Sequence, residues 1–471
     1  ADRMYFIRDN LVLRNIDGIY LIVDIENKYY IDRKHIQRVN LIGSILFKFM
    51  IELKSFSIES LYQKLVPYIK NFNVHMEDKI KDDIKKFINS LEKLNYVYST
   101  ERKSKNLATK KEINIEVNDT NWEDLNDYWY KRRHPIDGGM ELTPNCNMRC
   151  VHCYMKETME EKCLETEQIK LIIDKVVAKG VLFLFFTGGE ILTRKDFTEI
   201  YIYAKKKGLI IDLLTNGVLI NEELVKIFDK YPPARVSISV YGDNPESYNL
   251  VTSTRNNFDK LIKNIALLKK YNIHTELKYI GMKENAGEME NIKKIAEKYS
   301  ADFLSAFQLF PTLKCDTSIY NHRIENSEIV RIEKQNPERV KMWSSNVNRK
   351  NSYIDRENVP LFKCEIGTTS FLIDYRGFLN PCNKARIEEY NLLYDDFTVA
   401  WNDYAKFKKI PASKNEPCRK CDYFSICSPC PMVNYMSTGN YSIPPQVYCD
   451  LAKKRVEEFS KSEYDIYREN L

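Results

Sequence analysis

The sequence predicts an α/β protein in which a parallel sheet, closed or partly closed into a barrel, lies between two smaller modules. The first observation is length, because 471 residues exceed the size of one ordinary domain. The second is an alternation of buried strand-like and amphipathic helical segments, which is typical of βα units. The third is that ten of the 12 cysteines fall into two regions. The strands are predicted at 181–186, 210–214, 236–240, 275–280 and 303–309.

The charge pattern excludes several function classes. The net charge is only +6, and lysines are interspersed with acidic residues, as in 288–298, whereas a nucleic-acid binder concentrates its basic residues. The N-terminus lacks the apolar core of a signal peptide, and no apolar run approaches the roughly 18 residues of a membrane span. We therefore expect a soluble, cytoplasmic protein that binds neither nucleic acid nor membrane. In that reducing compartment, cysteines favour metal or catalytic roles over disulfides.

The first 100 residues form a separate pattern of strands followed by helices. Strands are predicted at 11–14, 19–25 and 29–31, and Asp17-Gly18 between the first two is a hairpin signal. Helices are predicted over 35–50 and from residue 58, with Ser57 as N-cap. A third helix carries Ile80, Ile84, Phe87, Ile88, Leu91 and Leu94 on one face. This order predicts a winged-helix-like α+β module over 1–100. A linker and bridging segment, 101–138, joins it to the next domain and begins with a lysine-rich stretch at 101–111.

The region 139–315 opens with a cysteine cluster after its first predicted strand. Cys146, Cys150 and Cys153 have the spacing C-x3-C-x2-C. Three thiolates can cap three irons of a cubane cluster and leave the fourth iron open for chemistry. The alternative is a zinc knuckle with His152 as fourth ligand, although zinc sites usually pair C-x2-C or C-x4-C units.

This cysteine motif, followed by Tyr154, resembles the radical S-adenosylmethionine (SAM) superfamily, whose fold is a partial (β/α)6 TIM-like barrel. The resemblance implies that Cys146, Cys150 and Cys153 hold a [4Fe–4S] cluster whose open iron binds SAM. Reductive cleavage of SAM, with an electron from a donor such as flavodoxin or ferredoxin, then gives a 5′-deoxyadenosyl radical that abstracts a substrate hydrogen. His152 stands where the family often places an aromatic residue against the adenine, and Tyr154 is expected beside the cofactor.

Further cofactor-binding residues are expected at the ends of the next strands. Gly188, Gly189 and Glu190 resemble the family's GGE motif, although the usual following proline is Ile191 here. The glycines permit close backbone approach, and Glu190 could accept hydrogen bonds from the SAM ammonium.

Three more positions resemble family residues near the ribose and the methionine carboxylate of SAM. Asn216 ends the strand after the GGE motif, Ser239 ends the one after that, and Arg255 is a carboxylate partner. Taken alone, each of these residues could equally well belong to an ordinary turn or cap a helix. Because they recur at successive strand ends, where such folds place their chemistry, the cofactor reading is favoured.

Residues 364–471, after a connecting segment at 316–363, are predicted to form a separate loop-rich domain and contain seven further cysteines. Their arrangement resembles the SPASM domain, an extension of radical SAM enzymes that act on peptides and proteins, although two residues separate Cys427 from Cys430 where three are commonest. The resemblance implies two auxiliary [4Fe–4S] clusters, three clusters in all. One would use Cys418, Cys421, Cys427 and Cys449. The other would use Cys364, Cys382 and Cys430.

The second auxiliary set has only three ligands. Either Cys315 supplies a fourth, or one iron stays open and could bind a substrate thiolate, which we favour. The alternative for 418–430 as a whole is a zinc ribbon.

The N-terminal module resembles the recognition element of enzymes that act on ribosomally synthesised and post-translationally modified peptides (RiPPs). Such elements bind the leader of a precursor peptide, here by adding a strand at 20–24 or 29–32. The alternative is a DNA-binding winged helix that presents Arg33, Lys34 and Arg38 to phosphates.

Together these features predict a radical SAM peptide maturase that forms cysteine thioether crosslinks in a precursor peptide, of the sactipeptide or ranthipeptide type. Carbon–carbon crosslinking, epimerisation and decarboxylation of a peptide remain alternatives. Sulfatase maturation is disfavoured because Asn383 replaces the aspartate that those enzymes carry after the equivalent of Cys382. An alternative from another functional class is a DNA-binding regulator whose cysteines bind structural zinc.

Overall fold

A computed structural model describes residues 3–27, 36–69, 74–99, 117–118, 121–348, 360–362, 364, 366–412, 416–427 and 429–460. The strand predicted at 29–31, the stretch 101–111 and Arg33 and Lys34 lie outside the described residues. None of the helices in the described parts is long and apolar enough to cross a lipid bilayer.

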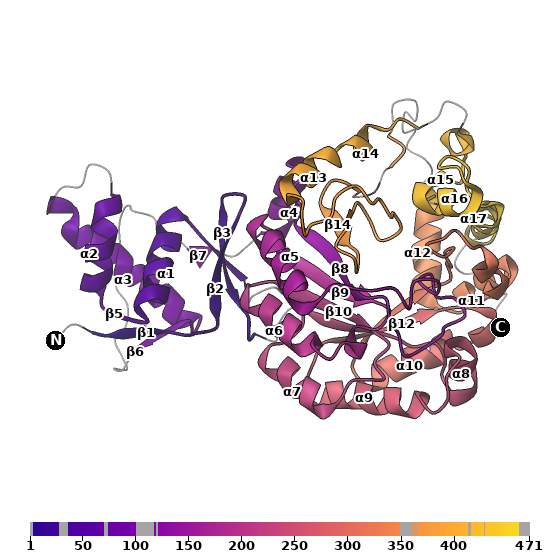
Figure 1. Ribbon diagram of the computed structural model, residues 1–471, viewed down its shortest axis with the longest axis horizontal. Coiled ribbons are helices and arrows are strands. Elements are labelled where there is room, and N and C mark those ends of the chain that lie inside the picture. Colours follow the sequence, from indigo (N-terminus) through magenta and orange to yellow (C-terminus); the bar gives the residue numbers. More distant parts are fainter. Residues whose placement is uncertain are drawn as a thin grey trace.

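The centre of the fold is an eight-stranded sheet in the order β13-β12-β11-β10-β9-β8-β14-β15 (Figure 1). Its first six strands run parallel to their neighbours. They are β8 (Asp137–Thr143), β9 (Phe183–Gly188), β10 (Ile210–Thr215), β11 (Arg235–Ser239), β12 (Thr275–Ile280) and β13 (Asp302–Ala306). The predicted fold class, six βα units in a partial barrel, is confirmed, and within the described residues the sheet stays open between β13 and β15.

Helices cover the outer face of this sheet (Figure 1). They are α5 (Thr166–Ala178), α6 (Phe197–Lys206), α7 (Glu222–Lys230), α8 (Pro245–Thr252), α9 (Phe258–Lys270) and α10 (Met289–Lys298). Because side chains alternate across a strand, Ile211 and Leu213 of β10 are buried in the main core, while Asp212 and Leu214 face a cavity. Each fully buried apolar side chain of this kind stabilises the fold by roughly 1.5–3 kcal/mol.

The C-terminal region continues the central sheet and then becomes helical. Strand β14 (Ser370–Ile373) pairs in parallel with β8, and β15 (Leu379–Asn380) pairs antiparallel with β14. The sheet therefore crosses the domain boundary predicted at residue 364. The helices of this region and its connector are α11 (Asn326–Lys334), α12 (Pro337–Asn348), α13 (Phe397–Asp403), α14 (Lys406–Lys409), α15 (Phe424–Cys427), α16 (Pro431–Thr438) and α17 (Gln446–Phe459).

The N-terminal module has the predicted mixture of strands and helices. A three-stranded sheet of β1 (Tyr5–Ile7), β5 (Ser55–Phe56) and β6 (Val97–Ser99) accompanies α1 (Leu41–Leu53), α2 (Ile58–Leu65) and α3 (Glu77–Lys93). A second sheet contains β2 (Leu11–Ile16), β3 (Ile19–Asp24), β4 (Ile36–Val39) and β7 (Val117–Asn118) in that order. The remaining helices are α4 (Trp122–Lys131) and the short 3-10 helices η1 (Val66–Tyr68), η2 (Val74–Met76), η3 (Ile191–Thr193), η4 (Lys283–Asn285), η5 (Ser318–His322) and η6 (Pro417–Lys420).

Local sequence signals in this module have mixed outcomes. Asp17 and Gly18 both have positive φ, 51° and 82°, which is the two-residue hairpin turn that joins β2 to β3. Ser57 caps α2 as predicted. The helix predicted over 35–50 is wrong at its start, because residues 36–39 pair with β3 and the helix begins only after Asn40. Here tertiary strand pairing overrides a helical sequence pattern.

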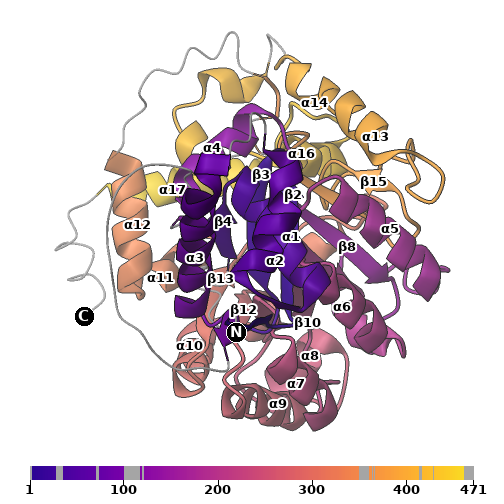
Figure 2. The same cartoon turned by 90° about the vertical axis from the view of Figure 1, so that its left-hand side faces the viewer.

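The second sheet of the module is docked on the barrel (Figures 1 and 2). One face, with Ile22 and Val39, packs against the module's helices, while Leu21 and Val23 belong to the core of the barrel. The guanidinium of Arg14 donates to the carbonyl oxygens of Gly208, 3.0 Å, and Val181, 2.5 Å. Burial lowers the pKa of Arg14 to about 10, a sign of how fully this contact excludes water. The module therefore sits against the amino ends of β9 and β10.

The predicted leader-binding edge at 20–24 is wrong, and the alternative edge at 29–32 lies outside the described residues. Strand β3 is flanked by β2 on one side and β4 on the other, so its backbone groups are already paired. In the described residues, the outer strands of this sheet are β2 and the two-residue β7.

Candidate active site

The first cysteine cluster lies on a loop at the carboxyl end of β8. Cys146, Cys150 and Cys153 line a cavity of about 330 Å³. The loop is fixed to the end of α8 by backbone hydrogen bonds, 3.1 Å from Arg149 N to the carbonyl of Thr252 and 2.9 Å from Val151 N to that of Val251. The three predicted cluster ligands thus face one space at the edge where α/β folds place their chemistry.

The glycine motif packs directly against this loop. Gly189 N donates to the carbonyl of Thr143 across 2.8 Å. A Cβ at Gly188 would lie 2.2 Å from that same oxygen, and one at Gly189 would lie 2.3 Å from the carbonyl oxygen of Asn145. Gly188 also has φ +142°, which side chains rarely allow. Only glycine therefore fits between the end of β9 and the cysteine loop.

Glu190 does not line the cavity; its carboxylate instead binds the segments that surround the cavity. It is 1% exposed, and its carboxylate accepts from Leu192 N (3.0 Å), Thr215 Oγ1 (2.8 Å) and Asn216 N (2.7 Å). Burial raises its pKa in spite of these bonds. Its predicted contact with the SAM ammonium stays a prediction, because in this structure both oxygens bind the chain itself.

Other predicted cofactor residues divide into two groups. Tyr154, Asn216 and Ser239 line the cavity together with both glycines. Asn216 also donates to Asn147 Oδ1 across 2.7 Å, which ties the end of β10 to the cysteine loop. Arg255 is exposed and lies outside the lining residues.

His152 gives the cavity an aromatic wall. Its ring meets that of Tyr241 edge-on, with 4.6 Å between centroids, and its Nδ1 is buried without a hydrogen-bond partner among the described residues. Burial, helped by the charge of His322, lowers the pKa of His152 to about 4, so the ring is neutral at pH 7. An uncharged ring with an unsatisfied nitrogen suits contact with a planar, hydrogen-bonding group such as adenine.

The cysteines are not activated by the protein alone. Burial raises the pKa of Cys146 to about 11 and raises that of Cys150 as well. Cationic iron would supply the charge that stabilises these thiolates. Within the described residues, no three or more His, Cys, Asp or Glu side chains converge on a single metal ion. A cubane cluster, unlike one ion, binds each thiolate through a different iron.

The structure brings four of the seven cysteines of the C-terminal region together. Cys418, Cys421, Cys427 and Cys449, the four residues predicted for one auxiliary cluster, line one small cavity of about 30 Å³. Burial raises the pKa of Cys427 to about 12, with a contribution from the other three thiols.

The remaining auxiliary cysteines are less closely grouped. Burial raises the pKa of Cys382, with a small contribution from the thiol of Cys430, and both cysteines lie against the main core. Cys364 is exposed, and its carbonyl accepts from Lys408 Nζ across 2.6 Å. Cys315 is exposed in a loop with φ +66°. Whether either completes the site stays a prediction.

Several lining residues were missed by the sequence reasoning. They come from the loop after β13 and from the C-terminal region, and they are Gln308, Phe310, Lys384 and Met436. The signal for Lys384 was its place two residues after Cys382. No sequence signal identifies the others, because they meet the barrel only through the tertiary fold.

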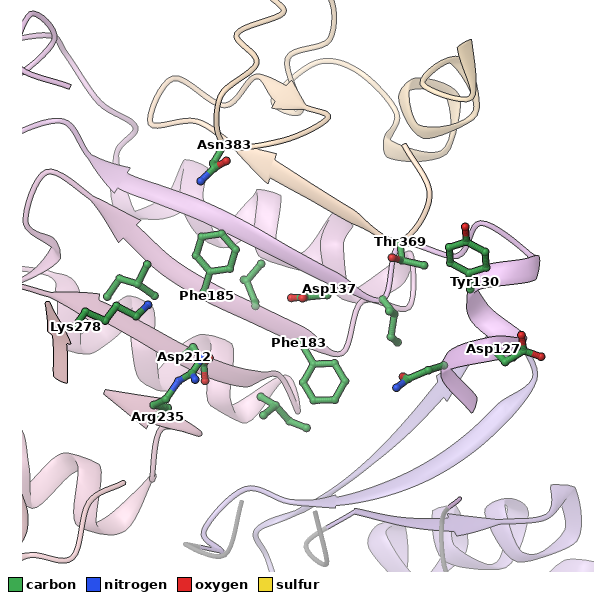
Figure 3. A pocket seen from close by; sticks show the side chains of 15 residues that line it. Asp127, Tyr130, Asp137, Phe183, Phe185, Asp212, Arg235, Lys278, Thr369 and Asn383 are labelled. Carbon is green, nitrogen blue, oxygen red and sulfur yellow. Dashed lines mark hydrogen bonds and ion pairs between the residues drawn. The ribbon is translucent and has the colours of Figure 1, made fainter. Parts of the chain in front are cut away.

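A second, larger cavity of about 820 Å³ lies on the concave face of the sheet (Figure 3). Its lining includes Phe183 and Phe185 of β9, and an ion-pair group in which Arg235 binds Asp212 across 2.7 Å. At one end it reaches α4 beside the N-terminal module. At the other end Leu214 and Asn383 line both cavities, so the two spaces adjoin.

Residues 140–296 match the Radical SAM superfamily. This segment is a radical SAM domain. Such a domain uses SAM and one [4Fe–4S] cluster, and the cysteine loop with its three thiols facing one cavity fits that requirement.

Two curated relatives are similar to parts of the chain. AdoMet-dependent heme synthase of Methanosarcina barkeri is 26% identical over 333 residues, which cover 66% of this chain and 94% of the relative. Antilisterial bacteriocin subtilosin biosynthesis protein AlbA of Bacillus subtilis is 30% identical over 160 residues, 34% of this chain and 36% of the relative.

One solved structure shares the architecture of nearly the whole chain. The crystal structure of Streptococcus suis SuiB bound to precursor peptide SuiA aligns with a TM-score of 0.56 at 14% identity, and the alignment covers 94% of this chain and 99% of that one. The likeness extends beyond the radical SAM domain into the N-terminal and C-terminal regions and concerns the fold alone.

Proposed function

We propose that the chain is a radical SAM enzyme that modifies a ribosomally made precursor peptide and forms a thioether between a cysteine sulfur and a carbon of another residue. The observation that carries this proposal is one cavity that is lined both by the three cysteines of the radical SAM loop and by the two residues that follow Cys382. The radical SAM loop with Cys146, Cys150 and Cys153 lines one wall, and Asn383 and Lys384, directly after Cys382, line another. A substrate between them would meet a radical source and an auxiliary site together.

The roles of the residues follow from their contacts. Cys146, Cys150 and Cys153 would hold the cluster, which with SAM supplies a 5′-deoxyadenosyl radical for hydrogen abstraction. The neutral ring of His152, with Tyr154, Asn216 and Ser239, would orient the cofactor. The buried Glu190 would hold the β9 and β10 ends in place through its three hydrogen bonds.

Two auxiliary clusters are part of the proposal. Cys418, Cys421, Cys427 and Cys449 would hold one, and their common cavity supports this set. Cys364, Cys382 and Cys430 would hold the other, with one iron open for the substrate thiolate. These clusters would carry away the electron left after bond formation, and a flavodoxin or ferredoxin would donate the electron that cleaves SAM.

The larger cavity supports a chain-like substrate. It extends from α4, beside the N-terminal module, along the concave face of the sheet to Leu214 and Asn383 at the first cavity (Figure 3). A peptide whose leader is bound by the module over 1–100 could reach the radical site through this space. The similarity to AlbA and the shared architecture with peptide-bound SuiB favour the same substrate class.

Heme synthesis is the second candidate function. It is favoured by the Methanosarcina barkeri relative, of which the match covers 94%. Its substrate would be a tetrapyrrole, and heme formation by the purified enzyme would be visible in the absorption spectrum.

The test has two parts. The anaerobically reconstituted enzyme is expected to contain about twelve irons with matching sulfide. Co-expression with short peptides encoded near its gene is expected to yield one peptide that loses two hydrogens per crosslink, whereas an unchanged mass with altered stereochemistry indicates epimerisation. Zinc without iron, or heme formation without any peptide product, would overturn the proposal.

A further inference from the structure

The cavity beside the cysteine loop is lined by one lysine side chain, that of Lys384. Among the described residues that line this cavity, no other is Lys or Arg, and none is Asp or Glu. We infer that Lys384 binds a carboxylate of the substrate, so that the residue presented to the radical is an aspartate or glutamate or lies next to one. This inference rests on the proposed function, because it specifies the chemistry of the peptide at the same site.

The contacts of Lys384 leave its ammonium group available. Its Nζ lies 4.1 Å from the centroid of the Phe310 ring and 3.5 Å from Asn383 Oδ1. No described residue forms an ion pair with it. An ammonium has three N–H donors, and a ring face and one long amide contact satisfy them only in part. A carboxylate is the group that completes such a site most strongly.

The position of Lys384 is the second argument. It follows Cys382 by two residues, and it lines a cavity whose other wall carries the cysteines of the radical SAM loop. Its neighbour Asn383 also lines the larger cavity. An acidic side chain on a peptide that passes from one cavity to the other would meet Lys384 between the two cysteine groups.

The ion pair would act with little competition from the protein. Glu190 accepts hydrogen bonds from Leu192, Thr215 and Asn216, and Glu141 pairs with Arg386, so neither of these two buried carboxylates pairs with Lys384. Lys384 is half-buried, and a charge in such a position is screened less than one on the open surface. Lys384 should therefore select substrates by charge as well as by shape.

Two experiments test the inference on the full-length, reconstituted enzyme. The first compares the peptide identified by mass shift with a version in which its acidic residue near the modified site is changed to the matching amide. Lys384→Met should lower kcat/KM for the acidic peptide roughly 10- to 100-fold and leave that for the amide peptide nearly unchanged. Lys406→Met is the matched control, because Lys406 also lies over a phenylalanine ring but pairs with Glu389 and Asp403 at the surface.

The second experiment needs no precursor peptide. Binding of N-acetyl-aspartate N-methylamide to the SAM-loaded enzyme is measured by calorimetry beside that of the asparagine analogue. The wild type should prefer the aspartate compound, and Lys384→Met should abolish that preference.

The outcomes separate this inference from the proposed function. If the enzyme binds the aspartate compound more tightly than the asparagine analogue but modifies no peptide, the peptide function is overturned and the carboxylate site is kept. A peptide product whose formation is equally reduced with acidic and amide peptides would overturn the carboxylate site and keep the function. A rise in KM for SAM, or a loss of iron, in Lys384→Met would also overturn it, since Lys384 would then serve the cofactor or the cluster.

Discussion

Arg386 forms a buried ion pair with Glu141, with 2.6 Å between Arg386 Nη2 and Glu141 Oε1. Glu141 lies on β8, just before the radical SAM cysteines, and Arg386 follows Cys382 in the C-terminal region. Neither Glu141 Oε2 nor Arg386 Nε has a hydrogen-bond partner in the described part of the chain. The pair joins the two cysteine-bearing segments through one contact.

Removal of Arg386 should destabilise the fold strongly. Arg386→Met leaves the carboxyl of Glu141 buried without its partner, and breaking a buried pair in this way costs about 3–5 kcal/mol of unfolding free energy. Anaerobic urea denaturation measures the change. Arg331→Met, which removes an exposed pair with Glu328 on one helix, should cost less than about 1 kcal/mol. Similar losses in both variants would contradict the role given to the buried pair.

Glu141 should also make stability depend on pH. Burial raises its pKa to about 7, although Arg386 opposes the shift, while in the unfolded chain the pKa is near 4.5. Between these values the unfolded state loses the proton first, so the contribution of Glu141 to stability falls as pH rises from about 4.5 to about 7. Glu141→Gln should remove this slope. A wild-type and a Gln variant with parallel stability curves over that range would contradict the shift.

Gly189→Ala should disturb the cysteine loop. The new Cβ would lie 2.3 Å from the carbonyl oxygen of Asn145, so the backbone before Cys146 must move. We expect a variant that folds but binds less iron and SAM, as measured by iron content and by 5′-deoxyadenosine formation. Gly287→Asn is the control, because no atom lies within 4 Å of a Cβ there and asparagine tolerates positive φ. Full iron content in Gly189→Ala would show that the loop adapts.

The open-iron hypothesis makes a prediction for Cys315. Cys315→Ala should leave the iron content of the reconstituted enzyme unchanged, because the thiol is exposed and is not expected to be a ligand. In the same assay Cys418→Ala should lose about four irons, the content of one cluster. Loss of iron from Cys315→Ala would make Cys315 the fourth ligand of the Cys364, Cys382 and Cys430 cluster.

The sequence predicted the barrel well because its strands are long apolar runs with strong local signals. The strands predicted at 210–214 and 275–280 occur where the pattern placed them, within one residue at the ends. The helix expected from residue 35 failed at 36–39, since pairing with a distant strand decides that conformation. Local periodicity carries no information about such a partner.

Within the site, the sequence motifs predicted part of the cavity lining, but they did not predict how the lining residues contact one another. The cysteine and glycine motifs were predictable because their spacing and close backbone approach leave few alternatives. Glu190 was predictable as a site residue, but its bonds to Leu192, Thr215 and Asn216 were not, because they depend on how three loops meet. Phe310 reaches the cavity from a segment that is remote in sequence, so no local pattern identifies it, whereas the signal for Lys384 was its place two residues after Cys382.

The docking of the N-terminal sheet on the barrel would restrict the length of a peptide chain that is bound at both places. Because Arg14 and the shared core hold that sheet against the amino ends of β9 and β10, each of its outer strands lies at a fixed distance from the cavity at the carboxyl ends. A chain held at both places must span a constant length. The spacing along that chain, and not only its side chains, would then decide which residue arrives at the reactive position.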